Sequence, residues 1–210
     1  MSLDLNLRRW AESKGFRYLA NSFDPKLIIF GEEHFKDELI GTQVELIKFL
    51  QPEYVLHELQ GNKPYNGDSL YQNIVIRNGE DSEIQNCEIN LFRLLSQHLG
   101  FRLVGADLSA SQAFSIPFDS VEDIHRYREV DGMAKTMVEY TRKSRRPVVT
   151  VVGAYHSHPA SPIHPILESE GIPYCVIQQA EAQRFLREPK ISLRANPVLY
   201  INSLDEFEVN

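Results

Sequence analysis

Short runs of apolar, often β-branched residues alternate along this chain with longer stretches in which apolar side chains recur every three or four positions. The runs predict buried strands, and the periodic stretches predict amphipathic helices. The predicted strands cover residues 27–31, 54–59, 102–108, 148–153, 174–178 and 198–202. The predicted helices cover residues 36–50, 83–99, 121–143 and 162–169.

Strands followed by helices in regular succession predict an α/β fold with a mostly parallel central sheet and helices on both faces. Parallel strands need long crossover connections, and continuously apolar strands need two covered faces. The two C-terminal strands, 174–178 and 198–202, are expected to add antiparallel edge strands. A chain of 210 residues can bury one sizeable core, so residues 1–210 are expected to form a single domain with a polar loop insertion near 60–82.

Composition narrows the function classes. The net charge of −7 argues against nucleic acid as a partner, because binding to a phosphate backbone needs basic surface. Cys87 and Cys175 form no C-x-x-C pair, which favours a reducing compartment. No apolar stretch approaches the roughly 20 residues of a membrane span, and the N-terminus lacks a signal-like apolar run. We expect a cytoplasmic protein with a small-molecule or peptide substrate and no membrane partner, and the sequence leaves a homodimer open.

Four predicted strands end in residues that carry functional chemistry. The carboxyl ends of parallel strands lie along one edge of a sheet, where ligands bind, so these residues are expected to converge. Because side chains alternate along a strand, only one of His57 and Glu58 can face the shared site. The strand-end residues are Glu32, Glu33 and His34 after the first strand, His57 and Glu58 at the second, Asp107 at the third, and His156 and His158 after the fourth.

Two of these strand ends share the form G-x-x-H, at Gly31 to His34 and at Gly153 to His156. Glycine lets the backbone turn closely at the strand end, and the imidazole three residues later returns over the edge. Two neutral imidazoles with one or two carboxylates suit a divalent transition metal that keeps open positions. Such a metal would lower the pKa of a bound water, while a second carboxylate such as Glu32 or Glu33 could move protons.

The order of these motifs resembles the superfamily that contains TraB and PrgY, the Tiki metalloproteases, the erythromycin esterases and the ChaN-like iron or haem binders. LIIFGEEHFKDELIGTQVELIKFLQPEYVLHEL (27–59) is similar to the opening strand, G-x-x-H turn, helix and Glu-ending strand of that family. YREVDGMAKTMVEYTRKSRRPVVTVVGAYH (127–156) is similar to its later helix with an arginine, followed by the second G-x-x-H. GADLS, at residues 105–109, resembles the aspartate-bearing strand end, and the match covers roughly residues 27–170.

The resemblance implies an EreA- or ChaN-like sheet and a metal-dependent hydrolase that cleaves an amide or ester bond, with a peptide as one substrate class. It implies His34 and His156 as paired functional histidines and Glu58 as the carboxylate, and we expect these three residues to bind a Mn, Co or Zn ion. Asp107 or Glu33 would act in support of them.

Arg128 matches the helix arginine of the family, which would hold an anionic group or a developing oxyanion. Phe35, where relatives often have a small residue, and the additional imidazole of His158 depart from the family pattern. His164, which lies among prolines, is a candidate for a more distant supporting contact or a substrate contact.

Other functions stay open on the sequence. The same crevice could bind a small molecule, a peptide, haem or iron without turnover, or a histidine could act as a general base in a metal-free esterase. The histidines and carboxylates could also merely hold loops together. G-A-Y-H-S-H-P additionally resembles the zinc motif of JAMM metalloproteases, but the later ligand positions of that motif are Ile166 and Ser169 here.

Overall fold

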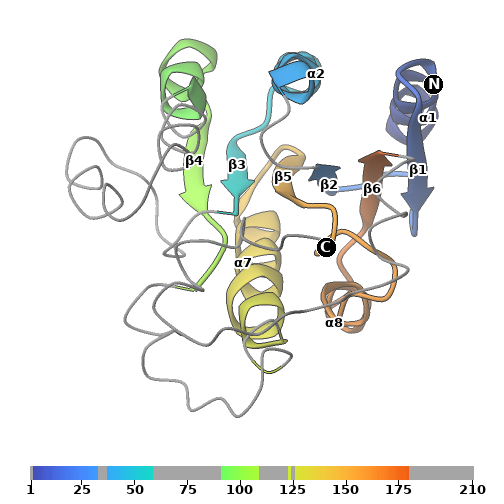
Figure 1. Ribbon diagram of the computed structural model, residues 1–210, viewed down its shortest axis with the longest axis vertical. Coiled ribbons are helices and arrows are strands. Elements are labelled where there is room, and N and C mark those ends of the chain that lie inside the picture. Colours follow the sequence, from blue (N-terminus) through green and yellow to red (C-terminus); the bar gives the residue numbers. More distant parts are fainter. Residues whose placement is uncertain (1, 33–36, 59–90, 109–122, 124–125, 180–210) are drawn as a thin grey trace, which may run out of the picture.

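A computed structural model describes residues 2–32, 37–58, 91–108, 123 and 126–179. The six strands among these residues form one sheet in the order β1-β6-β2-β5-β3-β4 (Figure 1). All neighbouring strands pair in parallel except β1 and β6, which are antiparallel, so the predicted α/β class with a mostly parallel sheet is confirmed. The strands are β1 (Phe16–Ala20), β2 (Leu27–Glu32), β3 (Tyr54–His57), β4 (Arg102–Gly105), β5 (Val148–Gly153) and β6 (Tyr174–Gln179).

The helices also follow the predicted pattern, apart from one at the N-terminus. The helix predicted over 83–99 is helical over residues 91–99, and residues 83–90 lie outside the described residues. It ends at Gly100, whose φ of +75° suits glycine. The predicted helix over 121–143 is described from residue 126 and contains a π-helical part, η2, followed by α7. The other helices and these two parts are α1 (Leu3–Ser13), α2 (Asp37–Leu50), η2 (Arg128–Ala134), α7 (Lys135–Lys143) and α8 (Ile163–Ser169).

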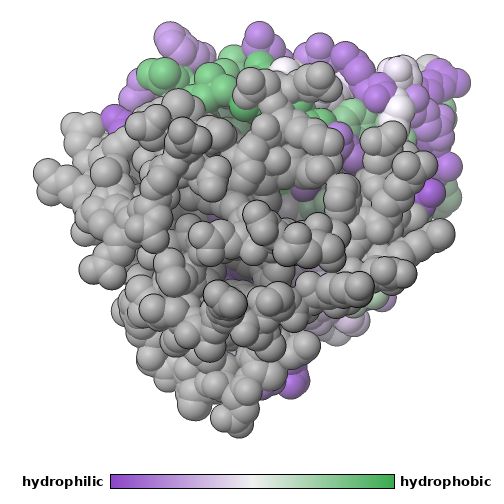
Figure 2. Space-filling model, in the orientation of Figure 1, coloured by the Kyte–Doolittle hydropathy of each residue, from purple (hydrophilic) through white to green (hydrophobic). Residues whose placement is uncertain are grey.

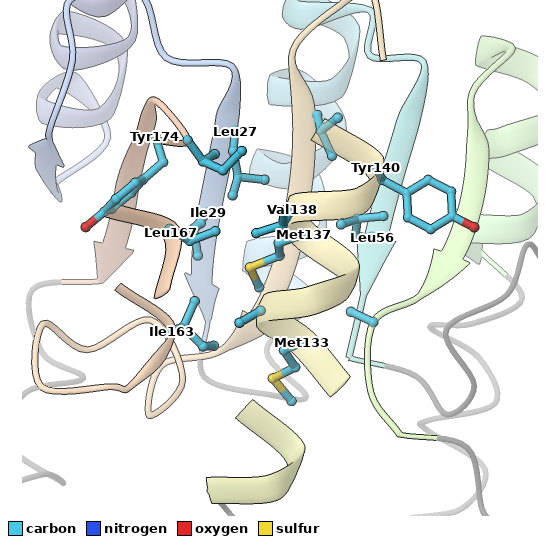
Figure 3. Close-up of a cluster of buried hydrophobic side chains, with 14 of the residues drawn as sticks. Leu27, Ile29, Leu56, Met133, Met137, Val138, Tyr140, Ile163, Leu167 and Tyr174 are labelled. Carbon is cyan, nitrogen blue, oxygen red and sulfur yellow. The ribbon is translucent and has the colours of Figure 1, made fainter. Parts of the chain in front are cut away.

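Two hydrophobic layers cover the sheet, one on each face. Alternate residues of β2 divide between them: Leu27 and Ile29 join the cluster under η2, α7 and α8, whereas Ile28 and Phe30 join the cluster under α1, α2 and helix 91–99. Figure 3 shows Met137 and the neighbouring side chains of the first cluster gathered between the helices and the strands. Full burial of each such side chain contributes roughly 1.5–3 kcal/mol, which explains why strands with continuous apolar sequence become the central ones.

The N-terminal segment forms structure that its sequence pattern did not predict. Helix α1 buries Leu7 and Ala11 completely against the sheet, although most of its residues are polar. The hydroxyl of Tyr18 in β1 donates a hydrogen bond of 2.8 Å to Asp4 in the first turn of α1. This contact connects the helix to the edge strand that follows it.

Strand β1 also corrects the predicted sheet edge. Residues 174–178, expected as an antiparallel edge strand, lie inside the sheet, where β6 pairs in parallel with β2 and antiparallel with β1. The prediction was wrong because the N-terminal strand occupies that edge. The predicted strand at 198–202 and the predicted loop insertion near 60–82 lie outside the described residues.

The surface of the described residues carries scattered apolar side chains. Figure 2 shows apolar surface near the top of the view, where helix 91–99 lies in Figure 1, and Leu94 of that helix is 54% exposed. Among the helices that the structure describes, none has the length and apolar character needed to cross a membrane.

Candidate functional site

The carboxyl ends of the central strands lie side by side, as the sequence predicts. Glu32 at the end of β2 is paired with Gly153 at the end of β5. Just past β3, the amide of Glu58 donates to the carbonyl of Val151 in β5 at 3.0 Å. The amide of Ala106, just past β4, likewise donates to the carbonyl of His57 at 2.7 Å. Residues that leave these strands are therefore brought to one edge of the sheet.

Arg128 links two of the predicted carboxylates at this edge. Its Nε donates to Asp107 Oδ2 at 2.6 Å, and its Nη2 donates to Glu58 Oε1 at 2.9 Å and also contacts Asp107. The amide of Leu108 donates to the other oxygen of Asp107 at 2.6 Å, which fixes that carboxylate. Burial alone would lower the pKa of Arg128, but the charges of Asp107 and Glu58 raise it, so the buried guanidinium stays positively charged.

Glu58 is the centre of the cluster. Its side chain is only 5% exposed, and Oε2 accepts a hydrogen bond of 2.7 Å from the amide of Gly153. Besides Arg128, its Oε1 contacts His156 Nε2 at 3.2 Å. Glu58 therefore joins the turn after β5 to the helix that carries Arg128.

The imidazole of His156 lies between two buried carboxylates. Its Nδ1 is 3.0 Å from Glu129 Oε1, and the hydroxyl of Ser161 donates to the same oxygen at 2.9 Å. Burial lowers the pKa of His156, but the charge of Glu58 and the hydrogen bonds to Glu129 and Glu58 raise it to about 9. With both ring nitrogens facing carboxylates, His156 is an imidazolium at neutral pH in the metal-free protein.

Two consecutive residues at the start of the π-helical η2, Arg128 and Glu129, are both buried in the site. A π-helix closes its hydrogen bonds over five residues, so its turn is wider, and such segments are frequent at functional sites. Gly132 lets η2 lie close to the backbone just past β4, because a Cβ at that position would lie 2.8 Å from the amide nitrogen of Leu108.

Glu129 and Ser161 are members of the site that the sequence reasoning missed. Consecutive residues of a helix point about a quarter of a turn apart, so the role expected of Arg128 gave no signal for Glu129. The only hint in the sequence is a glycine at position 132 inside a helical pattern, which marks close packing.

Four of the predicted site residues are brought together: Glu58, Asp107, Arg128 and His156. His34 and Glu33, predicted as a metal ligand and as a supporting carboxylate, lie outside the described residues. Together with Glu129, the four residues form a cluster of three carboxylates and two cationic groups.

Two other strand-end residues lie on the opposite face. His57 packs edge-on against Phe92, with ring centroids 4.9 Å apart, on the face covered by α1 and α2. Glu32 accepts a hydrogen bond from Gln43 of α2, so it also faces that side. The expectation that only one of His57 and Glu58 faces the site is confirmed, and Glu58 is that residue.

The two additional histidines of the turn after β5 have different surroundings. Nδ1 of His158 accepts a hydrogen bond from the amide of Ala160 at 3.1 Å, and this ring contacts none of the charged groups of the cluster among the interactions of the described residues. His164 is buried, and its Nε2 donates to the carbonyl of Ser157 at 3.2 Å. His164 therefore contacts the turn that carries His156.

The described residues alone do not supply a complete metal site. Within residues 2–32, 37–58, 91–108, 123 and 126–179, no group of three or more His, Cys, Asp or Glu side chains has the arrangement needed to hold a metal ion. Two atoms that could bind a metal, Glu58 Oε1 and His156 Nε2, lie 3.2 Å apart in the cluster.

The fold and the cluster define an α/β protein with a buried carboxylate, histidine and arginine cluster at the carboxyl edge of a mostly parallel sheet. Comparison with family models, with curated proteins and with solved structures finds no match to this chain.

Proposed function

We propose that this protein is a hydrolase that cleaves an amide or ester bond in a small molecule or peptide, with a divalent metal ion held by His156, Glu58 and His34. The observation that carries the proposal is the position of His156. Its Nδ1 faces the buried carboxylate of Glu129 at 3.0 Å, and its Nε2 faces Glu58 at 3.2 Å. Groups with shifted pKa values that converge at a strand edge are typical of active sites.

Two features of the described residues fit a metal at this position. The 3.2 Å between His156 Nε2 and Glu58 Oε1 is close to the roughly 3.3 Å that separates two ligands on one tetrahedral zinc ion. A metal-ligating histidine usually donates its other N–H to a carboxylate, which is the contact that Glu129 makes. His34, the second G-x-x-H histidine in the sequence, would supply the third protein ligand.

The bound ion would polarise the substrate carbonyl and make water acidic enough to attack near neutral pH. Glu129 would hold the Nδ1 proton of His156 and so keep Nε2 available to the ion. Glu33 is the candidate for moving the proton from water to the leaving group, since it adjoins His34 in the sequence.

Arg128 would orient the substrate. Within the part of the chain that the structure describes, no acceptor binds its Nη1, which is buried. A buried donor without an acceptor is costly, and a substrate carbonyl or carboxylate oxygen would satisfy it. Asp107 would hold the guanidinium in place through the 2.6 Å contact with Nε.

A metal-free hydrolase is the second candidate, and a specific observation favours it. Glu58 already accepts hydrogen bonds from Arg128 and from the amide of Gly153, so it is not a free ligand. Burial lowers the pKa of His156, but the two carboxylates raise it to about 9, which suits a cation that gives its proton to the leaving group.

The relation to the TraB, Tiki, erythromycin esterase and ChaN-like superfamily, with its EreA- or ChaN-like form of sheet, is part of the proposal. It is supported by the order of the motifs and by the convergence of Glu58, Asp107, Arg128 and His156, which the resemblance implies as functional residues.

The test begins with the metal content of untagged protein purified without added metal, measured by mass spectrometry. A panel of p-nitrophenyl esters and fluorogenic peptides would then be assayed with Mn, Co or Zn and with chelator. We expect about one metal ion per chain and chelator-sensitive hydrolysis. His156→Gln should lose the metal and lower kcat by about 10²- to 10⁴-fold.

His158→Gln is the matched control, because His158 lies two residues away on the same turn and contacts no carboxylate of the cluster among the described interactions. It should keep the metal and the activity. Protein that holds no metal and hydrolyses nothing after metal addition would refute the hydrolase. Hydrolysis that persists in chelator would support the metal-free candidate, and a Soret band on titration with haem would support a binding protein.

A further inference from the structure

The turn between β5 and α8 holds His156 in place, and its own position is fixed by close contacts. Ser157 is completely buried where β2 ends, and a Cβ on Gly31 would lie 1.9 Å from its Oγ. The Ser157 hydroxyl donates to the carbonyl of Ala154 at 3.1 Å, and Gln178 of β6 donates to the same carbonyl at 3.0 Å. These contacts hold the turn through the Ala154 carbonyl and the Ser157 side chain, and none of the three engages the Ser157 carbonyl.

His164 of α8 supplies a further contact to this turn. Its Nε2 is 3.2 Å from the carbonyl of Ser157, and since a carbonyl only accepts, Nε2 carries the proton. Burial lowers the pKa of His164, so the ring is neutral at physiological pH and is the Nε2–H tautomer. The ring stacks on Tyr174, with centroids 5.4 Å apart and planes 28° apart, which sets its orientation.

We propose that His164 is a positioning residue, which fixes the turn through the Ser157 carbonyl and thereby fixes His156 between Glu58 and Glu129. The catalytic meaning of this role rests on the proposed function, but the geometric role does not. The carbonyl that His164 binds belongs to the residue directly after His156. Active-site groups need positions accurate to about 0.5 Å, so one hydrogen bond on the adjacent residue is enough to affect the imidazole.

Packing alone does not account for His164. A phenylalanine would fill the same space and stack on Tyr174, but it would leave the buried Ser157 carbonyl without this donor. A glutamine places its side-chain N–H₂ at about the reach of Nε2, so it can restore the hydrogen bond without the ring. His164→Phe therefore keeps the ring volume and removes the hydrogen bond, whereas His164→Gln keeps the hydrogen bond and removes the ring.

The experiment observes His156 directly by NMR on chelator-treated protein. The Nδ1–H of His156, held by Glu129, should give a downfield resonance protected from exchange, which His156→Gln identifies by its loss. We expect His164→Phe to broaden or lose this resonance and His164→Gln to retain it. Tyr174→Phe, which keeps the stacked ring and removes only the hydroxyl contact with Glu168, should leave it unchanged.

An unchanged His156 resonance in folded His164→Phe protein would overturn the proposal. If His164→Phe does not fold, the wild-type protein still decides: ¹⁵N shifts that assign His164 as the Nδ1–H tautomer or as a cation would overturn it, and the neutral Nε2–H tautomer supports it. None of these measurements needs a substrate or a metal. The hydrolase proposal can therefore be refuted while the positioning role of His164 is supported. Equally, the positioning role can be refuted while the hydrolase proposal is supported.

Discussion

The continuous helix from residue 128 to 143 consists of two parts, and of the two only η2 buries charged side chains. The π-helical η2 turns Arg128 and Glu129 toward the strand ends, where charged groups are buried. The regular α7 instead buries Met137 and Tyr140 on the hydrophobic face of the sheet. The buried charged residues lie at the start of η2, and from Met133 onward, still within η2, the segment makes ordinary core contacts.

The charged pairs of the two parts differ in the same way. Arg128 is about 5% exposed and is bound by two buried carboxylates, whereas Arg142 of α7 is about 56% exposed and pairs with Glu170 at the surface. Removing one partner of a buried pair leaves an uncompensated charge, but an exposed pair is screened by water. The number of ion pairs on a helix therefore says little about stability until their burial is known.

The largest expected effect is that of Arg128→Met. It leaves Glu58 and Asp107 without their shared cation, and we expect the free energy of unfolding to fall by about 3–5 kcal/mol at pH 7. Urea unfolding followed by circular dichroism measures this. Arg142→Met is the control on the same helix and should cost at most about 1 kcal/mol. Equal losses in the two variants would contradict the difference between the two parts of the helix.

The second effect is a fall in stability at alkaline pH. Burial lowers the pKa of His156, but Glu58 and Glu129 raise it to about 9 in the folded protein, against 6.5 ordinarily. Protonated His156 stabilises the folded protein, and this stabilisation is fully present below about pH 6.5. The contribution, roughly 3 kcal/mol to the free energy of unfolding, is lost as the pH rises through 9.

Unfolding in chelator between pH 6 and 9 would show this loss in the wild type, and His156→Gln should lose much less stability over the same range. Arg128 is the other charged group beside the ring, and it remains a cation throughout this range. A wild-type stability that is flat or rises from pH 6.5 to 9 would mean that His156 is neutral in the folded protein.

A smaller effect is expected at Gly132. A Cβ there would lie 2.8 Å from the amide nitrogen of Leu108 and 3.2 Å from the carbonyl carbon of Asp107, and backbone cannot move aside easily. Gly132→Ala should cost about 1–3 kcal/mol and disturb the site. Gly41→Ala in α2, where a Cβ meets nothing within 4 Å, should instead stabilise by about 1 kcal/mol. Thermal unfolding of the two variants measures both effects. A loss of stability in Gly132→Ala alone would show that close packing, and not helix propensity, requires the glycine at position 132.

The smallest effect is expected at the junction of the two parts of the helix. Lys135 is 68% exposed and pairs with Asp131 one turn earlier, so Lys135→Ala should change the free energy of unfolding by no more than about 0.5 kcal/mol. A larger loss, measured in the same urea experiment, would indicate that the junction itself depends on this pair.

The apolar strands could be predicted from the sequence because their burial on both faces leaves a continuous hydrophobic run. β5 was predicted with its observed bounds, 148–153. The pattern gave no such run for α1 and β1, where Leu7 and Ala11 are buried among many polar residues and the strand is half exposed. An amphipathic helix with few buried residues and an edge strand carry weak patterns, so the N-terminal edge was missed and β6 was placed wrongly.

The sequence predicts only those site residues that follow from the alternation of side chains along a strand and from the positions of the strand ends. Glu58 and Asp107 follow from the rule that ligands bind at the carboxyl edge. His156 follows from the glycine that ends its strand. Glu129 could not be predicted, because it directly follows Arg128 in a helical pattern, and periodicity analysis places consecutive residues on different parts of the helix surface.

The sheet order has a consequence for how the chain folds. β5 lies between β2 and β3, so these two early strands become connected only after residues 148–153 have been made and inserted between them. Pairing of this kind joins residues about 90 to 120 positions apart and is slow to form, since the chain must first close a long loop. During synthesis on the ribosome, β3 and β4 can pair early, but the cluster around Glu58 and His156 is complete only when the last of its strands arrives. An assembled cluster would therefore be a marker that β3, β4 and β5 have come together.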